Sequence, residues 1–162
     1  MLVAAGSNVA PIENLRRALA VLEPHYAPLR VSQAYANAAV GFEGDEFVNL
    51  VVGFETRDDV REVIARLHEA EAACGRARDA PKWAPRSMDL DILLFGDTVC
   101  DEPGLRLPRP DLLRRAYMLG PAAEISPDTV HPTARRTLRE LWHGMQRDAP
   151  PHALRPVALP RQ

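Results

Sequence analysis

Long apolar segments are absent from this chain of 162 residues. No apolar run approaches the roughly 20 residues that a helix needs to cross a membrane. The first residues also lack the basic start and the apolar stretch of a secretory signal. We therefore expect a cytoplasmic protein that has no membrane partner.

Cysteine and lysine are scarce, and the two signs of charge nearly balance. Cys74 and Cys100 are too few for a disulfide framework and too far apart for a close metal-binding pair. We interpret them as small, buried or half-buried side chains in a reducing compartment. Lys82 is the only lysine. The formal net charge of −2 gives no bias toward nucleic acid, and we expect no such partner.

Two kinds of functional motif are missing as well. The chain has no glycine-rich phosphate loop and no dinucleotide fingerprint, so a bound polyphosphate would be held by side chains and metal ions. No histidine neighbours a serine or a cysteine in an activating motif. The sequence therefore offers no convincing nucleophile–base pair among its five histidines, which are His25, His68, His131, His143 and His152.

The composition is that of one globular domain. With 46% hydrophobic residues, the chain is long enough to bury a core. We expect a single domain over residues 1–148 and a proline-rich tail over residues 149–162 that packs poorly. Because no long exposed apolar stripe is evident, we expect a monomer.

The apolar residues predict strands and helices in the order β-α-β-β-α-β. Short apolar runs predict strands over residues 2–5 and 47–54, and alternating residues predict strands over residues 29–35 and from 89 onward. Few of these runs are long, which favours a mixed or antiparallel sheet. We expect an α+β fold, a ferredoxin-like βαββαβ sandwich whose mostly antiparallel sheet is covered by helices.

Two helices complete this unit. The first is expected to begin at Pro11 and to be ended by Pro24. The second, capped by Thr56 or Asp58, is expected to run to about Ala73. Shorter elements are expected later in the chain: a strand near residues 98–100 and helices over residues 111–115 and 137–145.

Two carboxylates lie in the last of the main strands. Asp89 and Asp91 are two residues apart, so both point to one side of the strand, roughly 7 Å apart, while Leu90 and Ile92 point to the other. Like charges on one face repel unless a cation lies between them, and strands disfavour aspartate. The solvated face of an edge strand would explain the pair. A site for divalent cations and a polyphosphate would explain it as well.

Cationic and aromatic residues flank this strand. Trp83 and Tyr117 offer flat faces to an aromatic heterocycle, although a position in the core would also explain a tryptophan. Arginine binds phosphate oxygens two at a time. The basic residues near the strand would be enough to surround a triphosphate, or they are simply surface residues: Arg76, Arg78, Lys82, Arg86 and Arg115.

Two further polar residues are candidates for the same site. Asn49 interrupts an apolar strand, so it needs a hydrogen-bond partner, which a ligand or a backbone group would provide equally well. His68 lies one turn before Glu71 on the predicted helix. It would either line the site or be a partly exposed helix residue.

The residues around the two aspartates closely resemble the signature of a known family. The matching string is Arg76-x-Arg78, followed by Trp83-x-Pro85-Arg86-x-x-Asp89-x-Asp91. It is similar to that of 6-hydroxymethyl-7,8-dihydropterin pyrophosphokinase, the folate-pathway family that moves a pyrophosphoryl group from ATP to a pterin alcohol. The turn Gly6-Ser7-Asn8 and the strand Phe47-Val48-Asn49 also look like that family. The resemblance extends to about Asp148.

The resemblance implies a role for each matching residue. Asp89 and Asp91 would hold two Mg²⁺ ions that bridge the phosphates of ATP, with Arg76 and Arg86 as catalytic phosphate contacts. ATP would be bound by His68, Glu71, Arg78, Trp83, Ile92, Arg109 and Arg115. The pterin would be bound by Val40, Phe47, Asn49, Trp83 and Tyr117. The implied reaction is in-line attack of the pterin hydroxyl on the β-phosphorus, with AMP leaving.

Three segments depart from the family pattern. The loop after the second strand reads Asn37-Ala38-Ala39-Val40-Gly41 in place of a Pro-Pro-Leu-Gly type stretch. Asp79 stands where other members often have a polar or basic residue. Arg109 stands where histidine is common, and arginine is able to replace it as a phosphate donor. We expect activity with altered nucleotide affinity.

Three other functions fit parts of the pattern. A nucleotidyltransferase also combines Gly-Ser with Asp-x-Asp, but those elements are close in sequence, whereas Ser7 and Asp89 are far apart. A non-catalytic α+β module would bind a small ligand through the same sheet, but it would need no paired aspartates. A diverged, inactive family member would still bind nucleotide or pterin. Metal-dependent release of AMP distinguishes these three from the pyrophosphokinase.

Overall fold

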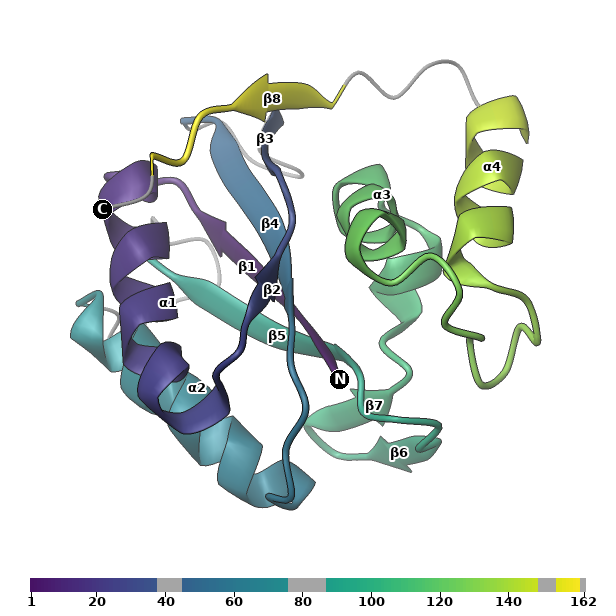
Figure 1. Ribbon diagram of the computed structural model, residues 1–162, viewed down its shortest axis with the longest axis horizontal. Coiled ribbons are helices and arrows are strands. Elements are labelled where there is room, and N and C mark those ends of the chain that lie inside the picture. The colour runs from purple at the N-terminus through teal and green to yellow at the C-terminus, as the bar shows by residue number, and fades with distance from the viewer. Residues whose placement is uncertain (38–44, 76–86, 149–153, 161–162) are drawn as a thin grey trace.

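A six-stranded sheet lies at the centre of the molecule (Figure 1). The computed structural model describes residues 1–37, 45–75, 87–148 and 154–160. The strands of the sheet are β1 (Leu2–Ser7), β2 (Arg30–Val31), β3 (Ala34–Asn37), β4 (Phe47–Gly53), β5 (Asp89–Leu94) and β8 (Arg155–Val157). Their order is β5-β1-β4-β3-β8, with β2 also paired to β4, and every paired neighbour is antiparallel. The predicted antiparallel sheet covered by helices is confirmed.

The strand predicted over residues 29–35 is divided into β2 and β3 around Ser32. This serine is buried and makes two hydrogen bonds to Val51 in β4. Its N–H donates to the Val51 carbonyl at 2.9 Å, and its Oγ accepts from the Val51 N–H at 2.9 Å. The Ser32 side chain thus replaces one backbone acceptor of the sheet. Both backbone groups of Val51 stay hydrogen-bonded where β2 and β3 are interrupted.

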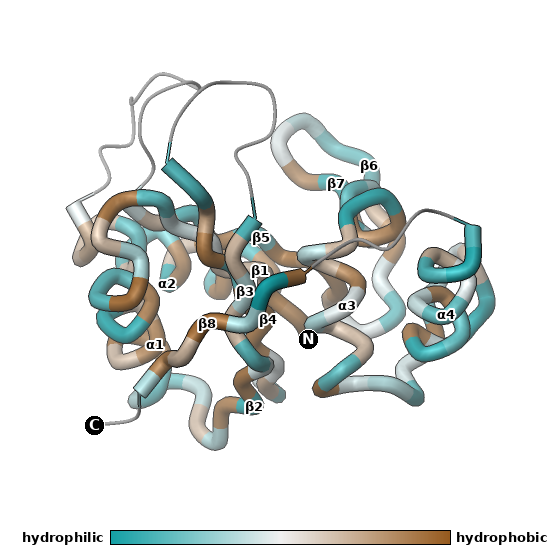
Figure 2. The backbone as a smooth tube through the Cα atoms, turned by 90° about the horizontal axis from the view of Figure 1, so that it is seen from above, coloured by the Kyte–Doolittle hydropathy of each residue, from teal (hydrophilic) through white to brown (hydrophobic). Residues whose placement is uncertain are grey.

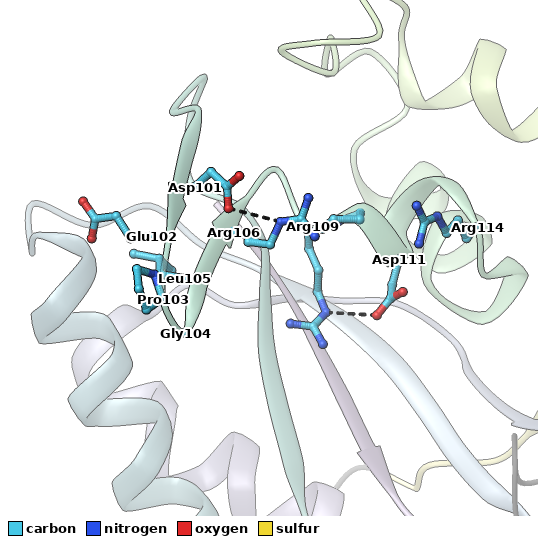
Figure 3. A pocket seen from close by; sticks show the side chains of 10 residues that line it. Asp101, Glu102, Pro103, Gly104, Leu105, Arg106, Arg109, Asp111 and Arg114 are labelled. Carbon is cyan, nitrogen blue, oxygen red and sulfur yellow. Dashed lines mark ion pairs between the residues drawn. The ribbon is translucent and has the colours of Figure 1, made fainter.

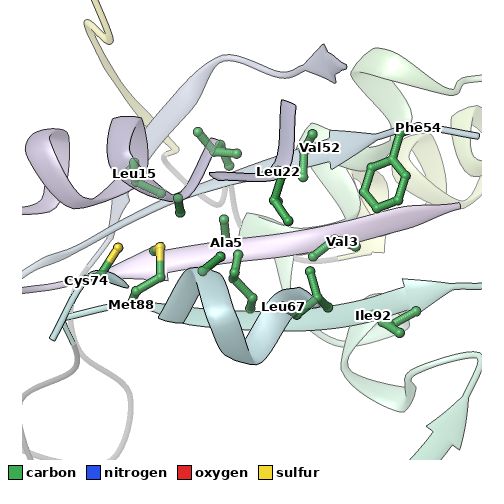
Figure 4. Packing of buried hydrophobic residues seen from close by; sticks show 14 of the residues in the cluster. Val3, Ala5, Leu15, Leu22, Val52, Phe54, Leu67, Cys74, Met88 and Ile92 are labelled. Atoms are coloured by element: carbon green, nitrogen blue, oxygen red, sulfur yellow. The ribbon is translucent and has the colours of Figure 1, made fainter. Parts of the chain in front are cut away.

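Helices α1 (Pro11–Tyr26) and α2 (Val60–Ala73) cover one face of the sheet (Figures 1 and 2). Leu15 and Leu22 of α1 and Val63 and Leu67 of α2 are buried at helical spacing. They pack with alternate residues of β1, β4 and β5 in one apolar cluster (Figure 4). Burial of this stripe, rather than intrinsic helix propensity, holds both helices on the sheet.

The sequence predicted that Pro24 ends helix α1, but the helix continues to Tyr26. The Tyr26 ring stacks on Phe54 with ring centroids 4.3 Å apart, and its hydroxyl donates to Asp58 Oδ2 at 3.0 Å. Proline in a helix removes one hydrogen bond and introduces a clash. The tertiary contacts of Tyr26 outweigh that cost in the last turn.

Helix α2 is capped by Asp59, and not by Thr56 or Asp58. The Asp59 side chain accepts from the Glu62 N–H at 2.9 Å, while the Glu62 side chain accepts from the Asp59 N–H at 2.7 Å. This reciprocal capping box satisfies two amide groups at the start of the helix. Asp58 instead accepts the hydrogen bond from Tyr26.

The opposite face of the sheet is covered by α3 (Ala116–Ile125) and α4 (Leu138–Asp148). The sequence predicted α4 but missed α3. Gly120 and Pro121 lie inside α3, and most of its residues are buried, so it shows neither good helix propensity nor a polar face. A Cβ at Gly120 would lie 3.0 Å from the Trp142 ring and from Leu154, which explains glycine at this close approach. No helix in the described ranges is long and apolar enough to cross a bilayer.

A small hairpin and a short helix extend from the end of β5. The hairpin consists of β6 (Cys100–Glu102) and β7 (Leu105–Leu107), and Gly104 in its turn has φ +78°. A 3₁₀ helix, η1 (Pro110–Leu113), follows where a helix over residues 111–115 was predicted. The strand expected near residues 98–100 is thus one half of a hairpin.

The sequence predicted a C-terminal tail that packs poorly, but part of this tail forms a strand of the sheet. Strand β8 pairs with β3, with Tyr35 opposite Pro156. Val157 and Leu159 pack against the core cluster beneath α1 and α2. The tail therefore extends the sheet by one strand.

Candidate active site

A row of functional positions crosses the sheet on the face that carries α3. In the strand register, Asp89 lies opposite Gly6, Gly6 opposite Asn49, and Asn49 opposite Tyr35. Directly paired residues in antiparallel strands share a face. At the far end of this row the Tyr35 hydroxyl donates to Glu124 of α3 at 2.9 Å. The row therefore lies on the face of the sheet that α3 covers.

The two aspartates of β5 lie on this face, as the alternation predicted. Asp89 and Asp91 are half-buried, whereas Leu90 and Ile92 are buried in the cluster under α1 and α2. The pair therefore lies at the partly exposed surface of an edge strand and is not part of the core. The side chain of Ile92 points away from the aspartates, so a contact with a nucleotide would involve its backbone.

Glu71 ties the end of α2 to the same strand. Its Oε1 accepts a hydrogen bond from the Leu90 N–H at 2.9 Å, between the two aspartates. Leu90 lies on the edge strand of the sheet, where a backbone N–H would otherwise lack a ladder partner. His68 lies one turn earlier on α2 and is exposed. Glu71 thus helps to hold β5 in place, whether or not it also contacts a nucleotide.

Arg109 lies next to Asp91. Its Nη1 is 3.4 Å from Asp91 Oδ1, and its Nε is 3.6 Å from Asp111 Oδ2 (Figure 3). The sequence predicted a phosphate-binding role for Arg109 but not this pairing, because the two residues belong to different elements. The structure brings a guanidinium to one of the two paired carboxylates.

Tyr117 and Arg115 lie close to the same charges. Burial raises the pKa of the half-buried Tyr117 phenol above its ordinary value, the Arg115 charge opposes this rise, and the carboxylates of Asp111 and Asp89 add to it. Tyr117 is therefore protonated at neutral pH and presents an uncharged ring beside Asp89. An uncharged, partly buried ring suits stacking against a flat heterocycle.

Asn49 is held in one orientation by a neighbour that the sequence did not single out. Its Nδ2 donates to Oδ1 of Asn37, which ends β3. Its Oδ1 lies over Gly6, where an added Cβ would come within 2.5 Å of it. Phe47 begins the same strand and lies opposite Asn37. Asn37 was missed because the second strand was predicted to end at residue 35.

A cleft of about 680 Å³ opens between the β6–β7 hairpin and η1, and Arg109 lines it. Figure 3 shows that charged side chains of both signs line it. They are Arg106, Arg109, Arg114, Asp101, Glu102 and Asp111. Arg109 lines this cleft and also pairs with Asp91, so it is the residue that connects the cleft to the aspartates.

Five of the residues predicted for the site lie outside the described ranges: Val40, Arg76, Arg78, Trp83 and Arg86. Lys82 and the altered loop around Val40 do so as well. The described part of the chain resumes at Ser87, and the Ser7 Oγ donates a hydrogen bond to the Ser87 carbonyl at 2.6 Å. This contact fixes the start of β5 to the end of β1.

The described carboxylates fit a magnesium ion only as a partial ligand set. The described ranges contain no group of three or more His, Cys, Asp or Glu residues that could hold a metal. Mg²⁺ in nucleotide sites is commonly held by one or two carboxylates, with phosphates and water completing the set. Asp89 and Asp91 match that pattern, and Arg109 already supplies a positive charge to Asp91.

Two carboxylates on one strand, with an arginine between them and a charged cleft, are compatible with phosphoryl transfer, which depends on charge and positioning rather than on a nucleophile–base pair. The chain belongs to the 7,8-dihydro-6-hydroxymethylpterin-pyrophosphokinase family, whose model matches residues 2–127. The resemblance found in the sequence is thereby confirmed.

Relatives agree with this assignment, and a solved structure shares the fold. The chain is 34% identical over 137 residues to 2-amino-4-hydroxy-6-hydroxymethyldihydropteridine pyrophosphokinase of Aquifex aeolicus, covering 83% of this chain and 85% of the relative. It is 37% identical over 137 residues to the enzyme of that name from Pseudomonas aeruginosa, covering 82% and 84%. Plasmodium falciparum HPPK-DHPS with pteroate shares the fold, with a TM-score of 0.70 and 13% identity over 88% of this chain. This chain spans 43% of that longer one.

Proposed function

We propose that this chain transfers a pyrophosphoryl group from ATP to 6-hydroxymethyl-7,8-dihydropterin, giving the pterin diphosphate and AMP in folate biosynthesis. The names of its relatives and its place in the family support this reaction. The observation that carries the proposal is the placement of Asp89 and Asp91 on one face, in register with Gly6 and Asn49. With these residue roles, the polyphosphate end of one substrate and the heterocycle of the other would lie on a single surface.

The reaction depends on positioning and charge rather than on a covalent intermediate. The pterin hydroxyl oxygen attacks the β-phosphorus in line, the bond to the oxygen bridging the α- and β-phosphorus breaks, and that oxygen leaves with AMP. The hydroxyl proton passes to solvent. The arginines predicted to bind the phosphates would stabilise the charge that develops, and among the described residues these are Arg109 and Arg115.

Asp89 and Asp91 would hold Mg²⁺, and we expect two ions. When bound, Mg²⁺ supplies positive charge to the phosphate oxygens. The half-buried carboxylates, at adjacent same-face positions of one strand, support this assignment. Carboxylate oxygens are the ligands that this hard cation prefers.

The remaining assignments follow from where the residues lie. Glu71 contacts the strand of the aspartates, and Glu71, His68 and Ile92 would lie along the nucleotide. Asn49 and Tyr117 would bind the pterin together with Phe47. Val40, Arg76, Arg78, Trp83 and Arg86 keep the roles that the resemblance implies. The strand order β5-β1-β4-β3 with antiparallel neighbours supports a ferredoxin-like arrangement of the core. A single domain, a monomeric state and a cytoplasmic location stay predictions.

The rival functions are weaker. In a nucleotidyltransferase the serine would face the substrate, but Ser7 is fully buried and bonds the backbone carbonyls of Ser87 and Val9. An inactive family member would not need the aspartates on one face, with an arginine beside Asp91. A plain binding module would need neither.

A product assay with ATP, Mg²⁺ and the hydroxymethyl pterin tests the proposal, with AMP resolved from ADP. Asp91→Asn should lower the rate of pterin-dependent AMP formation by about 10²-fold or more, because it removes one of two charges that hold the metal. Asp128→Asn is the matched control, since Asp128 is an exposed aspartate between α3 and α4. ADP as the product would indicate an ordinary phosphotransferase. Ligand binding without turnover would indicate an inactive relative.

A further inference from the structure

Arg109 lies between two carboxylates where β5 meets the cleft. Its Nη1 is 3.4 Å from Asp91 Oδ1, and its Nε is 3.6 Å from Asp111 Oδ2. Its backbone N–H donates to the carbonyl of Leu93 at 3.0 Å. The main chain of Arg109 is thus tied to β5, while only its side chain spans the gap between the two acids.

The contacts of this guanidinium are electrostatic rather than well-formed hydrogen bonds. Charge-assisted hydrogen bonds between nitrogen and oxygen are normally about 2.7–2.9 Å long, and both contacts are longer. The Arg109 Nε is buried and has no hydrogen-bond partner among the residues that the structure describes. Such an unpaired donor disfavours this position of the side chain. Charge holds Arg109 here, so a change in local charge is sufficient to move it.

A divalent cation bound by the aspartates would be such a change. Asp91 is the common partner, because it contacts Arg109 and is one of the two carboxylates proposed to hold the metal. At separations of about 4 Å, like charges near a protein surface repel by more than thermal energy. The side chains of Arg109 and Asp91 are both partly exposed, 34% and 27%, so the guanidinium has room to leave.

We propose that Arg109 is a built-in counter-ion of Asp91, which a divalent cation displaces, and that the released guanidinium then binds the polyphosphate. The cleft that Arg109 lines, with Asp111 at its edge, is the space into which the side chain moves. Asp91 is thus next to a cation in both states, first the guanidinium and then the metal ion. This inference rests on the proposed function, and it makes Arg109 a positioning residue that couples metal binding to nucleotide binding.

The coupling predicts effects of opposite sign for one substitution. Arg109→Gln removes the competing cation, so Mn²⁺ alone should bind about threefold to tenfold more tightly than to the unchanged protein. The same substitution removes a phosphate contact, so a non-hydrolysable ATP analogue with Mg²⁺ should bind about tenfold more weakly. A purely structural role for Arg109 predicts no gain in metal affinity.

The test is titration calorimetry of the full chain with Mn²⁺ in the absence of nucleotide. Arg114→Gln is the matched control, because Arg114 lines the same cleft, carries the same charge and forms no ion pair with Asp91. We expect its Mn²⁺ affinity to stay within about twofold of the unchanged protein. Arg109→Lys, which keeps the charge, should also stay close to the unchanged protein. Arg109→Met, which removes the charge and keeps an unbranched side chain, takes the place of the glutamine variant if that one does not fold.

Two results would overturn the inference. One is an unchanged Mn²⁺ affinity in Arg109→Gln, and the other is an equal gain in Arg109→Gln and Arg114→Gln, which would mean that only the overall field matters. Failure of the unchanged protein to form AMP would instead refute the proposed function, because the metal titration does not depend on turnover. The two failures are therefore distinguishable.

Discussion

The two faces of the central sheet differ in what they bury. The face under α1 and α2 is apolar along β1, β4 and β5. The opposite face is apolar only where α3 and α4 cover it, and it turns polar at Asp89, Gly6 and Asn49. Because neighbouring residues of a strand point to opposite sides, one stretch of β5 supplies both core and candidate site. In β5, a residue that packs in the core is thus followed directly by a residue of the candidate site.

The largest effect should come from the apolar face. Leu50 of β4 is fully buried beneath α1 and α2. Leu50→Ala should lower the free energy of unfolding by about 2–5 kcal/mol, because it removes buried methyl groups and leaves a cavity. Urea unfolding measures this loss. The turnover of the molecules that remain folded should be unchanged, and a large fall in their kcat would show that the two faces are not separable.

A smaller change on the site face should alter binding more than stability. Gly6→Ala places a Cβ 2.5 Å from Asn49 Oδ1, so the amide must move away from its position beside Asn37. We expect the KM for the pterin to rise about tenfold, with a stability loss of about 1–2 kcal/mol. Steady-state kinetics and urea unfolding measure the two quantities.

Gly53→Ala is the control for that substitution. It makes the same change in β4, where the new Cβ would meet Arg30 at 3.0 Å and Leu2 at 3.1 Å, away from the candidate site. Its unfolding free energy should fall while the pterin KM stays the same. A pterin KM that rises equally in both variants would assign the effect to the sheet rather than to Asn49.

The contact between Tyr26 and Asp58 should show a dependence on alkaline pH. Burial, followed by the hydrogen bond to Asp58, raises the pKa of Tyr26 to about 12 from its ordinary value of 10.0. A raised pKa in the folded protein means that the stabilisation is complete below pH 10 and is lost as the pH rises toward 12. Tyr26→Phe should cost about 1 kcal/mol at neutral pH and flatten this part of the profile. An unchanged profile would contradict the assignment.

The smallest effect should come from the exposed start of α4. Hydrogen bonds from Thr137, first from its backbone N–H, lower the pKa of Glu140. The stabilisation is present above the ordinary value of 4.5 and is lost as the pH falls below it. In Glu140→Gln this acid dependence should weaken, with a small shift of the unfolding midpoint between pH 3 and pH 6 (roughly the titration range of a carboxylate). A thermal scan at several pH values measures it.

Patterns in the sequence predicted those features of the fold that depend on residues close together in the chain. The period of two in β5 was enough to place Asp89 and Asp91 on one face, and it placed Leu90 and Ile92 in the core. Of the two capping residues predicted for α2, Asp58 is one position and Thr56 three positions before the observed cap, Asp59. The family resemblance named Arg109, which the structure places beside Asp91.

Non-local contacts account for what the sequence missed. Helix α3 forms despite Gly120 and Pro121 because it is buried between the sheet and α4. Strand β8 is defined by its pairing with β3, more than a hundred residues earlier in the chain. The pairing of Arg109 with Asp91 and of Asn49 with Asn37 likewise depends on the folded sheet.

Strand β8 has one more consequence, for the backbone groups at the edge of the sheet. Without residues 155–157, the edge of β3 would present unpaired backbone groups, which is a template for pairing between molecules. The strand that covers this edge contains Pro156, and proline has no N–H to offer to a further strand. The tail therefore closes the sheet on that side against aggregation, and a shortened protein that ends before it would be expected to self-associate.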